Sequence, residues 1–360
     1  MWYDTPATKV LGIKYPIVQG PFGGGPSSVE LVSTVSNAGG LGSFGMQTLE
    51  PEQMIEVARQ IRSATSKPFA INLWISNAQE EGASPKEVRR AGELLGPYYA
   101  ELGREVPAMP ERFIPDVDKQ LEAMLKIKPP VFSFVFGIAP AAVMAACKSL
   151  GILTMGTATT ALEAKALEAA GVDCIVASGF EAGGHKGSFL RSAEESLTGI
   201  FSLIPQVIDQ VRIPVIAAGG VADARGVAAA LVLGAHGVQI GTAFLACKES
   251  AASVPHRKAL WAGHGQSSTL TKAFTGRLAR SLPNRMTAEM NNGHSTVASY
   301  PVQAWYMGHL AKAAQVQGCD DFGSLSAGQS VSLIQHDSAR KLMEELVRET
   351  PAMLCKHGAC

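Results

Sequence analysis

The 360-residue sequence predicts an α/β fold, namely a (β/α)8 TIM barrel with an inserted helical substrate or lid domain. Short apolar runs alternate with helical patterns almost from end to end. Each run is continuously apolar, which is typical of parallel strands covered on both faces. The chain also exceeds the roughly 250 residues of a barrel alone, so it has room for an appended domain. A doubly wound open sheet is the alternative, but it would not usually use so many such units.

Eight apolar runs are predicted to form the barrel strands. They are residues 16–21, 41–46, 68–74, 131–137, 152–157, 174–179, 214–220 and 237–244. Helical segments lie between them, among them residues 27–37, 51–65, 160–170 and 223–233. Their ends carry the residues that start and stop helices, such as Asp223 as an N-cap and Gly171 and Gly234 beyond the last turn. A last helix at about 338–354 would close the barrel.

Two segments interrupt this alternation. Residues 76–128 are too long for one crossover, and we interpret about 76–118 as an insertion that precedes the third barrel helix. Residues 250–330 follow the eighth strand, contain no clear strand, and resemble a helical lid. The predicted division is therefore a barrel of residues 1–249 and 331–360 and a helical substrate or lid domain of residues 250–330.

Composition excludes several classes of function. The 31 basic and 31 acidic residues balance, and no basic stripe indicates nucleic-acid binding. No stretch approaches the roughly 18 apolar residues of a membrane helix, and the N-terminus lacks the pattern of a secretory signal. We therefore expect no nucleic acid or membrane partner and a cytoplasmic location. The six cysteines include no close CxxC pair, so a zinc site or redox dithiol is not expected.

The ends of five predicted strands are rich in glycine. They read QGPFGGGPSS, GGLGSFGM, SGFEAGGHKG, AAGGVAD and QIGTAF. Barrel chemistry lies at the C-terminal ends of the strands, and the seventh and eighth loops commonly bind a phosphate there. Glycine lets backbone N–H groups approach a ligand closely. Ordinary turn glycines would explain any one motif, but together they favour a platform for a phosphate-bearing cofactor.

The absence of several motifs narrows the choice of cofactor. The chain has no GxxxxGK[ST] loop, no GxGxxG in a Rossmann context, and no lysine placed in a strand for Schiff-base chemistry. Apart from Glu181 and His185, the strand ends carry almost no metal-ligating side chains, so we expect no metal. Flavin mononucleotide (FMN), which brings its own reactivity, fits this environment.

The segment IVASGFEAGGHKG, residues 175–187, resembles the signature of the nitronate monooxygenase family, once called 2-nitropropane dioxygenases. Relatives of that family include flavin-dependent enoyl-acyl-carrier reductases. PIVQGP, NAGGLGSFG, INLW, VIAAGG, GVQIGTAFLACKES, FTGRLARSLPNRM and AGQ follow the family's order from about residue 10 to 350. The resemblance implies an FMN-dependent barrel enzyme that oxidises alkyl nitronates with O2 to a carbonyl compound and nitrite. A homodimer is left open.

The resemblance also assigns residues by position. It makes His185 the catalytic residue. The residues that it places against FMN are Gly20, Pro21, Phe22, Asn72, Ser178, Gly179, Gly184, Ala218, Gly219, Gly220, Gln239, Gly241 and Thr242. The amides of Asn72 and Gln239 suit an isoalloxazine edge, and glycine N–H groups suit a phosphate. The chain departs from many relatives at Phe22, Met155 and Ser326, positions that we expect near the flavin and the substrate.

His185 is the strongest single candidate, because an imidazole titrates near neutrality. In its neutral form it can take the α-proton of a nitroalkane. Glu181, four residues earlier, either orients the ring or only acts as a cap or points outward. Weaker candidates are His256, His264, His294, His309, Tyr300, Trp305, Tyr306, Lys186, Arg277 and Arg280.

The residues leave other functions open. The first alternative is an NAD(P)H-dependent flavin reductase of an enoyl thioester or quinone, with Arg277 and Arg280 as candidates for binding a carboxylate or a nucleotide phosphate. A flavin-free isomerase or lyase of phosphate sugars is the second. A non-catalytic binding module is the least favoured, since it has little need of glycines that converge on one end of a barrel.

Overall fold

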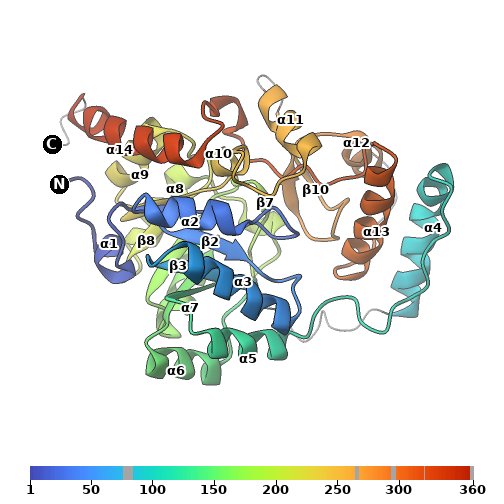
Figure 1. The fold of residues 1–360 in the computed structure, drawn as a ribbon, viewed down its shortest axis with the longest axis horizontal. Helices are drawn as coiled ribbons and strands as arrows, with labels where there is room; N and C mark the ends of the chain where they lie inside the picture. Colours follow the sequence, from blue (N-terminus) through green and yellow to red (C-terminus); the bar gives the residue numbers. More distant parts are fainter. Residues whose placement is uncertain (76–83, 264–266, 293–296, 320, 357–360) are drawn as a thin grey trace.

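A computed structural model describes residues 1–75, 84–263, 267–292, 297–319 and 321–356 of the chain. Figure 1 shows a barrel of strands and surrounding helices, with a separate helical lobe at one side. Among the described helices, none is both long and apolar enough to cross a membrane.

Within the described residues, eight parallel strands form the barrel, one in each predicted run. They are β1 (Ile17–Gln19), β2 (Gly42–Gly45), β3 (Phe69–Trp74), β4 (Val131–Val135), β5 (Leu153–Ala158), β6 (Cys174–Ser178), β8 (Val215–Ala218) and β9 (Gly237–Ile240). Their order in the sheet is β1-β9-β8-β6-β5-β4-β3-β2. A parallel bridge between Val18 and Leu41 joins the two outer strands, supported by a 2.9 Å bond from Gln19 N to Leu41 O. The barrel prediction is confirmed, and the open-sheet alternative is excluded.

The eighth strand is shorter than predicted. The continuous apolar run of residues 237–244 predicts one strand, but β9 ends at Ile240 and a short helix, α10 (Thr242–Leu245), follows. The backbone turns at Gly241, which has φ −100° and ψ −76°. Apolar content alone does not separate a strand from a buried helical turn, which explains the error.

Helices cover the outside of the barrel. They are α2 (Val29–Asn37), α3 (Pro51–Ala64), α5 (Val117–Ile127), α6 (Ala141–Leu150), α7 (Ala161–Ala169), α8 (Ile200–Ile208), α9 (Ala224–Val232) and α14 (Ala339–Lys356). The predicted Asp223 cap is present, since its side chain accepts from Arg225 N and Gly226 N. The Thr160 side chain likewise caps α7 by accepting from Glu163 N. Short 3₁₀ turns lie at Glu194–Ser196 and Val331–Leu333.

The N-terminal end of the barrel is closed. Helix α1 (Pro6–Leu11) places Ala7 and Leu11 in the same buried cluster as the interior side chains Val18 and Met155. Met155 is fully buried in this cluster, which also contains Ala218. Because α1 fills this end, the opposite end is the one that can receive a ligand.

A second buried cluster forms the lobe. Helices α4 (Pro85–Glu101), α12 (Arg285–Asn292) and α13 (Val302–Val316) pack together around Leu95, Tyr99, Met286 and Tyr306. The Tyr99 hydroxyl donates to the Tyr306 carbonyl oxygen over 2.7 Å. Part of the predicted insertion thus packs against the predicted lid, while its first residues, 76–83, lie outside the described part of the chain. Helix α11 (Val254–Ala262) belongs to a third cluster with Leu282 and Val331.

The segment 250–330 is not purely helical, which corrects the sequence-based expectation. It contains β10 (Thr269–Thr271) and β11 (Ala279–Ser281), which form an antiparallel hairpin. A third strand, β7 (Gly184–His185), pairs antiparallel with β11. Strands of two or three residues are too short for hydrophobic periodicity to identify them. Their pairing joins the loop after β6 to the hairpin.

Candidate active site

The predicted cofactor residues form an arc on adjacent strands. β1, β9, β8 and β6 are neighbours in the barrel and run in the same direction. Their C-terminal ends therefore bring Gly20, Gly241, Gly219 and Gly179 to one edge. Asn72 lies in β3, on a different part of the same barrel. The arc contains the seventh and eighth strand ends, where barrels commonly bind phosphate.

Glycine is required along this arc for two different reasons. A Cβ on Gly179 would lie 2.5 Å from Ile200 Cγ2, and one on Gly20 would lie 3.3 Å from Gly241 Cα, so these positions are needed for close backbone packing. Gly219 and Gly220 have φ values of +112° and +70°, which side chains rarely adopt. A Cβ on Gly241 would meet Phe22 Cε1 only at 3.9 Å. The arc is therefore tightly packed at Gly20 and Gly179 and open at Gly241.

Polar groups accompany the glycines. Asn72 is buried and its Nδ2 donates to Ser133 Oγ over 2.9 Å. Thr242 Oγ1 accepts from Gly328 N over 2.8 Å, so its own proton is available to another acceptor. Gln239 pairs with Ala218 across β8 and β9 and is half-buried. The remaining predicted cofactor residues lie at or beyond strand ends: Pro21 and Phe22 follow β1, Ser178 ends β6, and Gly184 begins β7.

His185 is held by the hairpin of the appended segment. It pairs with Ala279 in the β7–β11 ladder, and its Nε2 lies 2.8 Å from Thr275 Oγ1. The ring packs edge-on against Trp74 at the end of β3, with the centroids 4.7 Å apart. Phe136, after β4, lies 6.0 Å away. The imidazole is thus at the same end of the barrel as the glycine arc.

The surroundings of His185 favour its neutral form. Burial is the main cause that lowers the pKa of His185 to about 3, and the cations Arg277 and Lys186 contribute to the same shift. The side chain is half-buried rather than sealed. At neutral pH the imidazole therefore carries a lone pair that can accept a proton.

Lys186 and Arg280 secure the loop that carries His185. The buried Lys186 ammonium donates to the carbonyl oxygens of Phe180 and Ala182. Arg280, also buried, donates from Nε to the Phe180 carbonyl oxygen over 3.0 Å. Burial lowers the pKa of Lys186 to about 7, and Arg280 contributes to this shift. Arg280 is therefore bound to backbone carbonyl groups, which favours a structural role over anion binding.

Glu181 caps a helix and does not orient the histidine. Its two carboxylate oxygens accept from Ile200 N, the first residue of α8, over 2.9 and 3.2 Å. A carboxylate at this position also interacts favourably with the helix dipole. Of the interpretations that the sequence left open, the structure supports capping, and Thr275 is the described residue that hydrogen-bonds with the imidazole.

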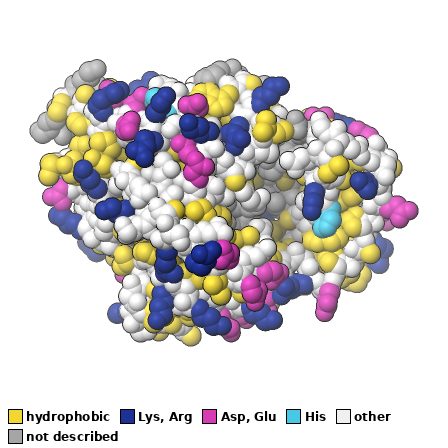
Figure 2. All heavy atoms as spheres, in the orientation of Figure 1, with side chains coloured by type: hydrophobic (Ala, Val, Ile, Leu, Met, Phe, Trp, Pro, Cys, Tyr) yellow, Lys and Arg dark blue, Asp and Glu magenta, His cyan; other side chains and the backbone are white. Residues whose placement is uncertain are grey.

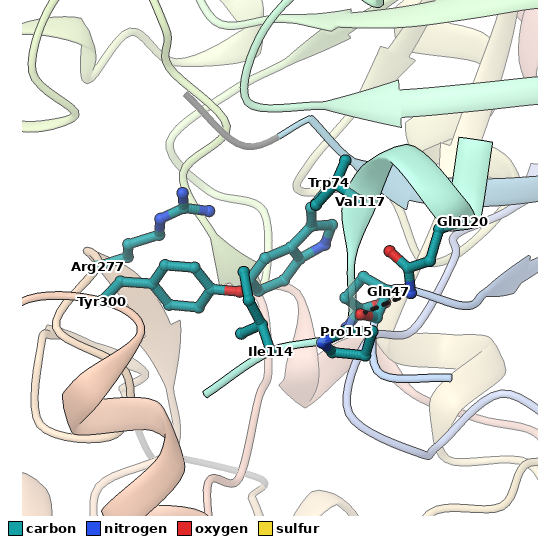
Figure 3. A pocket seen from close by; sticks show the side chains of 8 residues that line it. All are labelled: Gln47, Trp74, Ile114, Pro115, Val117, Gln120, Arg277 and Tyr300. Atoms are coloured by element: carbon teal, nitrogen blue, oxygen red, sulfur yellow. Dashed lines mark hydrogen bonds between the residues drawn. The ribbon is translucent and has the colours of Figure 1, made fainter. Parts of the chain in front are cut away.

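A pocket lies between the barrel and the lobe, where Figure 2 shows the surface hollowed. Figure 3 shows Arg277 and Tyr300 on one side of it and Trp74 on the other. The Arg277 guanidinium stacks on two rings, 3.9 Å from the centroid of Phe136 and 4.0 Å from that of Tyr300. The other lining residues are Gln47, Ile114, Pro115, Val117 and Gln120. The pocket therefore joins an aromatic wall to a cation next to His185.

The remaining candidates lie elsewhere or serve the core. His256 is buried and its Nε2 contacts Ser326 O at 3.0 Å, which indicates a structural role. His309 is exposed and its ring packs on Trp305. Tyr306 belongs to the lobe core. His264 and His294 lie outside the described residues.

Sequence reasoning missed Trp74, Phe136 and Thr275 as members of the site. Trp74 and Thr275 stand in INLW and FTGR, motifs that the resemblance includes, so a signal was present. Phe136 has a φ of +66°, which the sequence does not reveal. Tyr300 lies before α13 rather than on it, and this places its ring in the pocket.

A closed (β/α)8 barrel with a neutral histidine and a pocket at the C-terminal ends of its strands has the organisation of an enzyme. Residues 4–349 match the nitronate monooxygenase family. A probable nitronate monooxygenase of Staphylococcus haemolyticus is 36% identical over 356 residues, covering 98% of this chain and 99% of the relative. One of Staphylococcus aureus strain Newman is 37% identical over 350 residues, 97% of this chain and 98% of the relative.

Comparison with solved structures agrees with the family match. A nitroalkane oxidase from Streptomyces ansochromogenes superposes with a TM-score of 0.89 at 36% identity, covering 98% of this chain and 99% of that one. FabK from Thermotoga maritima superposes with a TM-score of 0.76 at 28% identity, covering 98% and 97%. The chain therefore belongs to the nitronate monooxygenase family, and it is an oxidoreductase.

Proposed function

We propose that this oxidoreductase is an FMN-dependent nitronate monooxygenase, which uses O2 to convert alkyl nitronates to a carbonyl compound and nitrite. The observation that carries the proposal is the place of His185. It lies at the mouth of the barrel, beside an aromatic pocket and at the same end as the glycine arc. The family match and the similarity to a nitroalkane oxidase support this activity.

The proposed cofactor residues fit FMN. Among the described residues, no backbone acceptor binds the amides of Gly219 and Gly220, so these N–H groups are available to a phosphate. The Thr242 hydroxyl retains a proton to donate. The amides of Asn72 and Gln239 offer donors and acceptors to a flavin ring. When bound, FMN would take electrons from the nitronate and pass them to O2.

We propose that His185 is the catalytic base toward neutral nitroalkanes. Burial keeps the pKa of His185 low, so the imidazole is unprotonated at pH 7 and has a lone pair to offer the substrate. The proton moves from the α-carbon of the substrate to a ring nitrogen, and the negative charge moves to the nitro group. The imidazolium and the nearby Arg277 cation then attract the nitronate. General-base assistance of this kind contributes roughly 10²–10⁴ in rate.

A test begins with the absorption spectrum of the purified full-length protein, which should show bound flavin. Under anaerobic conditions, ethyl nitronate should reduce that flavin without NAD(P)H, and in air the reaction should release nitrite. His185→Asn should keep the flavin and the turnover of preformed nitronate but lose about 10²-fold or more of the turnover of neutral nitroethane. If nitroethane turnover is fully retained, His185 is not the base.

A pair of glycine variants, one in the proposed phosphate loop and one elsewhere as a control, tests the cofactor site. Gly220→Val places a branched side chain at φ +70°, in the proposed phosphate loop, and should lower flavin retention. Gly103→Val has a similar φ of +64° in the turn after α4, away from the arc, and should leave flavin retention unchanged. Equal retention in both variants would count against the phosphate assignment.

The alternative activity is an NAD(P)H-dependent flavin reductase. The similarity to FabK is the reason to test it in the same flavin-reduction experiment. Rapid bleaching of the flavin by NADH, with no reduction by nitronate, would select it. We also propose that residues 250–330 act as the substrate domain, since this segment supplies Arg277 and Tyr300 to the pocket.

A further inference from the structure

Thr275 contacts the imidazole from outside the barrel. It lies between β10 and β11, ninety positions along the chain from His185, and its Oγ1 is 2.8 Å from His185 Nε2. The β7–β11 ladder holds the two backbones together at Ala279 and His185. The contact is thus built by pairing of the hairpin with the histidine loop.

The other partners of the Thr275 hydroxyl determine which atom donates. Arg277 N donates to Thr275 Oγ1 over 3.3 Å, and Thr275 Oγ1 can donate to the Arg277 carbonyl oxygen over 3.3 Å. A hydroxyl has one proton and two lone pairs. If its proton goes to the Arg277 carbonyl, the second lone pair can accept from Nε2–H, and all three hydrogen bonds form. If its proton goes to Nε2, only two form.

Counting donors and acceptors therefore favours the tautomer with the proton on Nε2. In that tautomer Nδ1 carries the lone pair. Among the described residues, His185 Nδ1 has no hydrogen-bond partner, and the half-buried ring keeps part of its surface accessible. Burial and the neighbouring cations also lower the pKa of His185, so the ring is neutral at pH 7. A neutral imidazole carries one proton, and the tautomer determines which nitrogen holds it.

We propose that Thr275 is a positioning residue that fixes His185 in the Nε2–H tautomer and so makes Nδ1 the nitrogen that accepts the substrate proton. This inference rests on the proposed function only for the last step, the transfer of the proton. The tautomer itself follows from the contacts of Thr275 with His185 and with the Arg277 backbone.

Nitrogen NMR of the full-length protein labelled with ¹⁵N-histidine tests the tautomer directly. His185→Asn identifies the His185 signals, because those signals disappear. The wild type should show a protonated Nε2 and an unprotonated Nδ1 at pH 7. Thr275→Val, which removes the hydroxyl but keeps the shape, should redistribute the proton between the two nitrogens. Thr275→Ser, which keeps the hydroxyl, should restore the wild-type pattern.

Thr269→Val is the matched control, since it removes a hydroxyl from the same hairpin without touching His185. It should leave the His185 signals unchanged. A wild type with the proton on Nδ1, or a Thr275→Val spectrum identical to the wild type, would overturn the proposal. If Thr275→Val fails to fold, the tautomer of His185 in the wild type and in Thr275→Ser still tests the proposal.

Turnover separates this inference from the proposed function. Thr275→Val should lose about 10-fold or more of its rate with neutral nitroethane, because part of the imidazole is in the wrong tautomer. Its rate with preformed nitronate, which needs no deprotonation, should stay within twofold. Equal losses with both substrates would overturn the positioning role. If the wild type turns over neither substrate, the proposed function is rejected, while the NMR result still decides the tautomer.

Discussion

The low proton affinity of His185 makes the stability of the protein depend on pH. The pKa of His185 is about 3 in the folded protein and 6.5 in the unfolded chain. Between these values the unfolded chain binds more protons than the folded protein, so the free energy of unfolding falls as the pH is lowered from 6.5 toward 3. At pH 5 the pH lies 1.5 units below the pKa of the imidazole in the unfolded chain, 6.5. One unit corresponds to about 1.4 kcal/mol, so the free energy of unfolding should fall by about 2 kcal/mol.

Urea unfolding of the wild type and His185→Asn at pH 7 and pH 5 measures this effect. Other buried groups, such as His236 and His256, titrate in both proteins and cancel in the comparison. The wild type should therefore lose about 2 kcal/mol more than His185→Asn between the two pH values. Equal losses in the two proteins would refute the view that burial keeps this imidazole neutral.

Three further substitutions have expected outcomes. Glu181→Gln should lower the free energy of unfolding by about 1 kcal/mol in urea, because it weakens the cap on Ile200 N, and should leave the His185 NMR signals unchanged. Glu163→Gln should lower it by about 2–4 kcal/mol, since both buried oxygens accept backbone N–H groups at Thr159 and in the loop after β7. Lys186→Met should speed hydrogen exchange of the amides in residues 180–185, and unchanged exchange would contradict its role as a clamp.

The barrel could be predicted from sequence because its signals are local. Each strand is a continuous apolar run, and α9 begins at the predicted cap, Asp223, whose side chain makes the expected bonds. The position of His185 at the end of a strand followed from the barrel itself. Glycine-rich strand ends also identified the edge on which the arc lies.

The partners of His185 could not be predicted in the same way. Thr275 reaches it through pairing of strands only two and three residues long, between segments ninety positions apart. The left-handed backbone of Phe136, which places its ring on Arg277, leaves no mark on composition or periodicity. The role of Glu181 likewise depended on the approach of Ile200, a contact between the loop after β6 and the start of α8. Such contacts are set by tertiary packing rather than by local pattern.

The ladder between β7 and β11 makes the histidine a shared part of two regions of the chain. If the hairpin swung outward, it would withdraw Thr275 and pull apart the strand that carries the imidazole. Access that required such an opening would separate the imidazole from Thr275. A reactant that enters without moving the hairpin leaves both His185 and Thr275 in place.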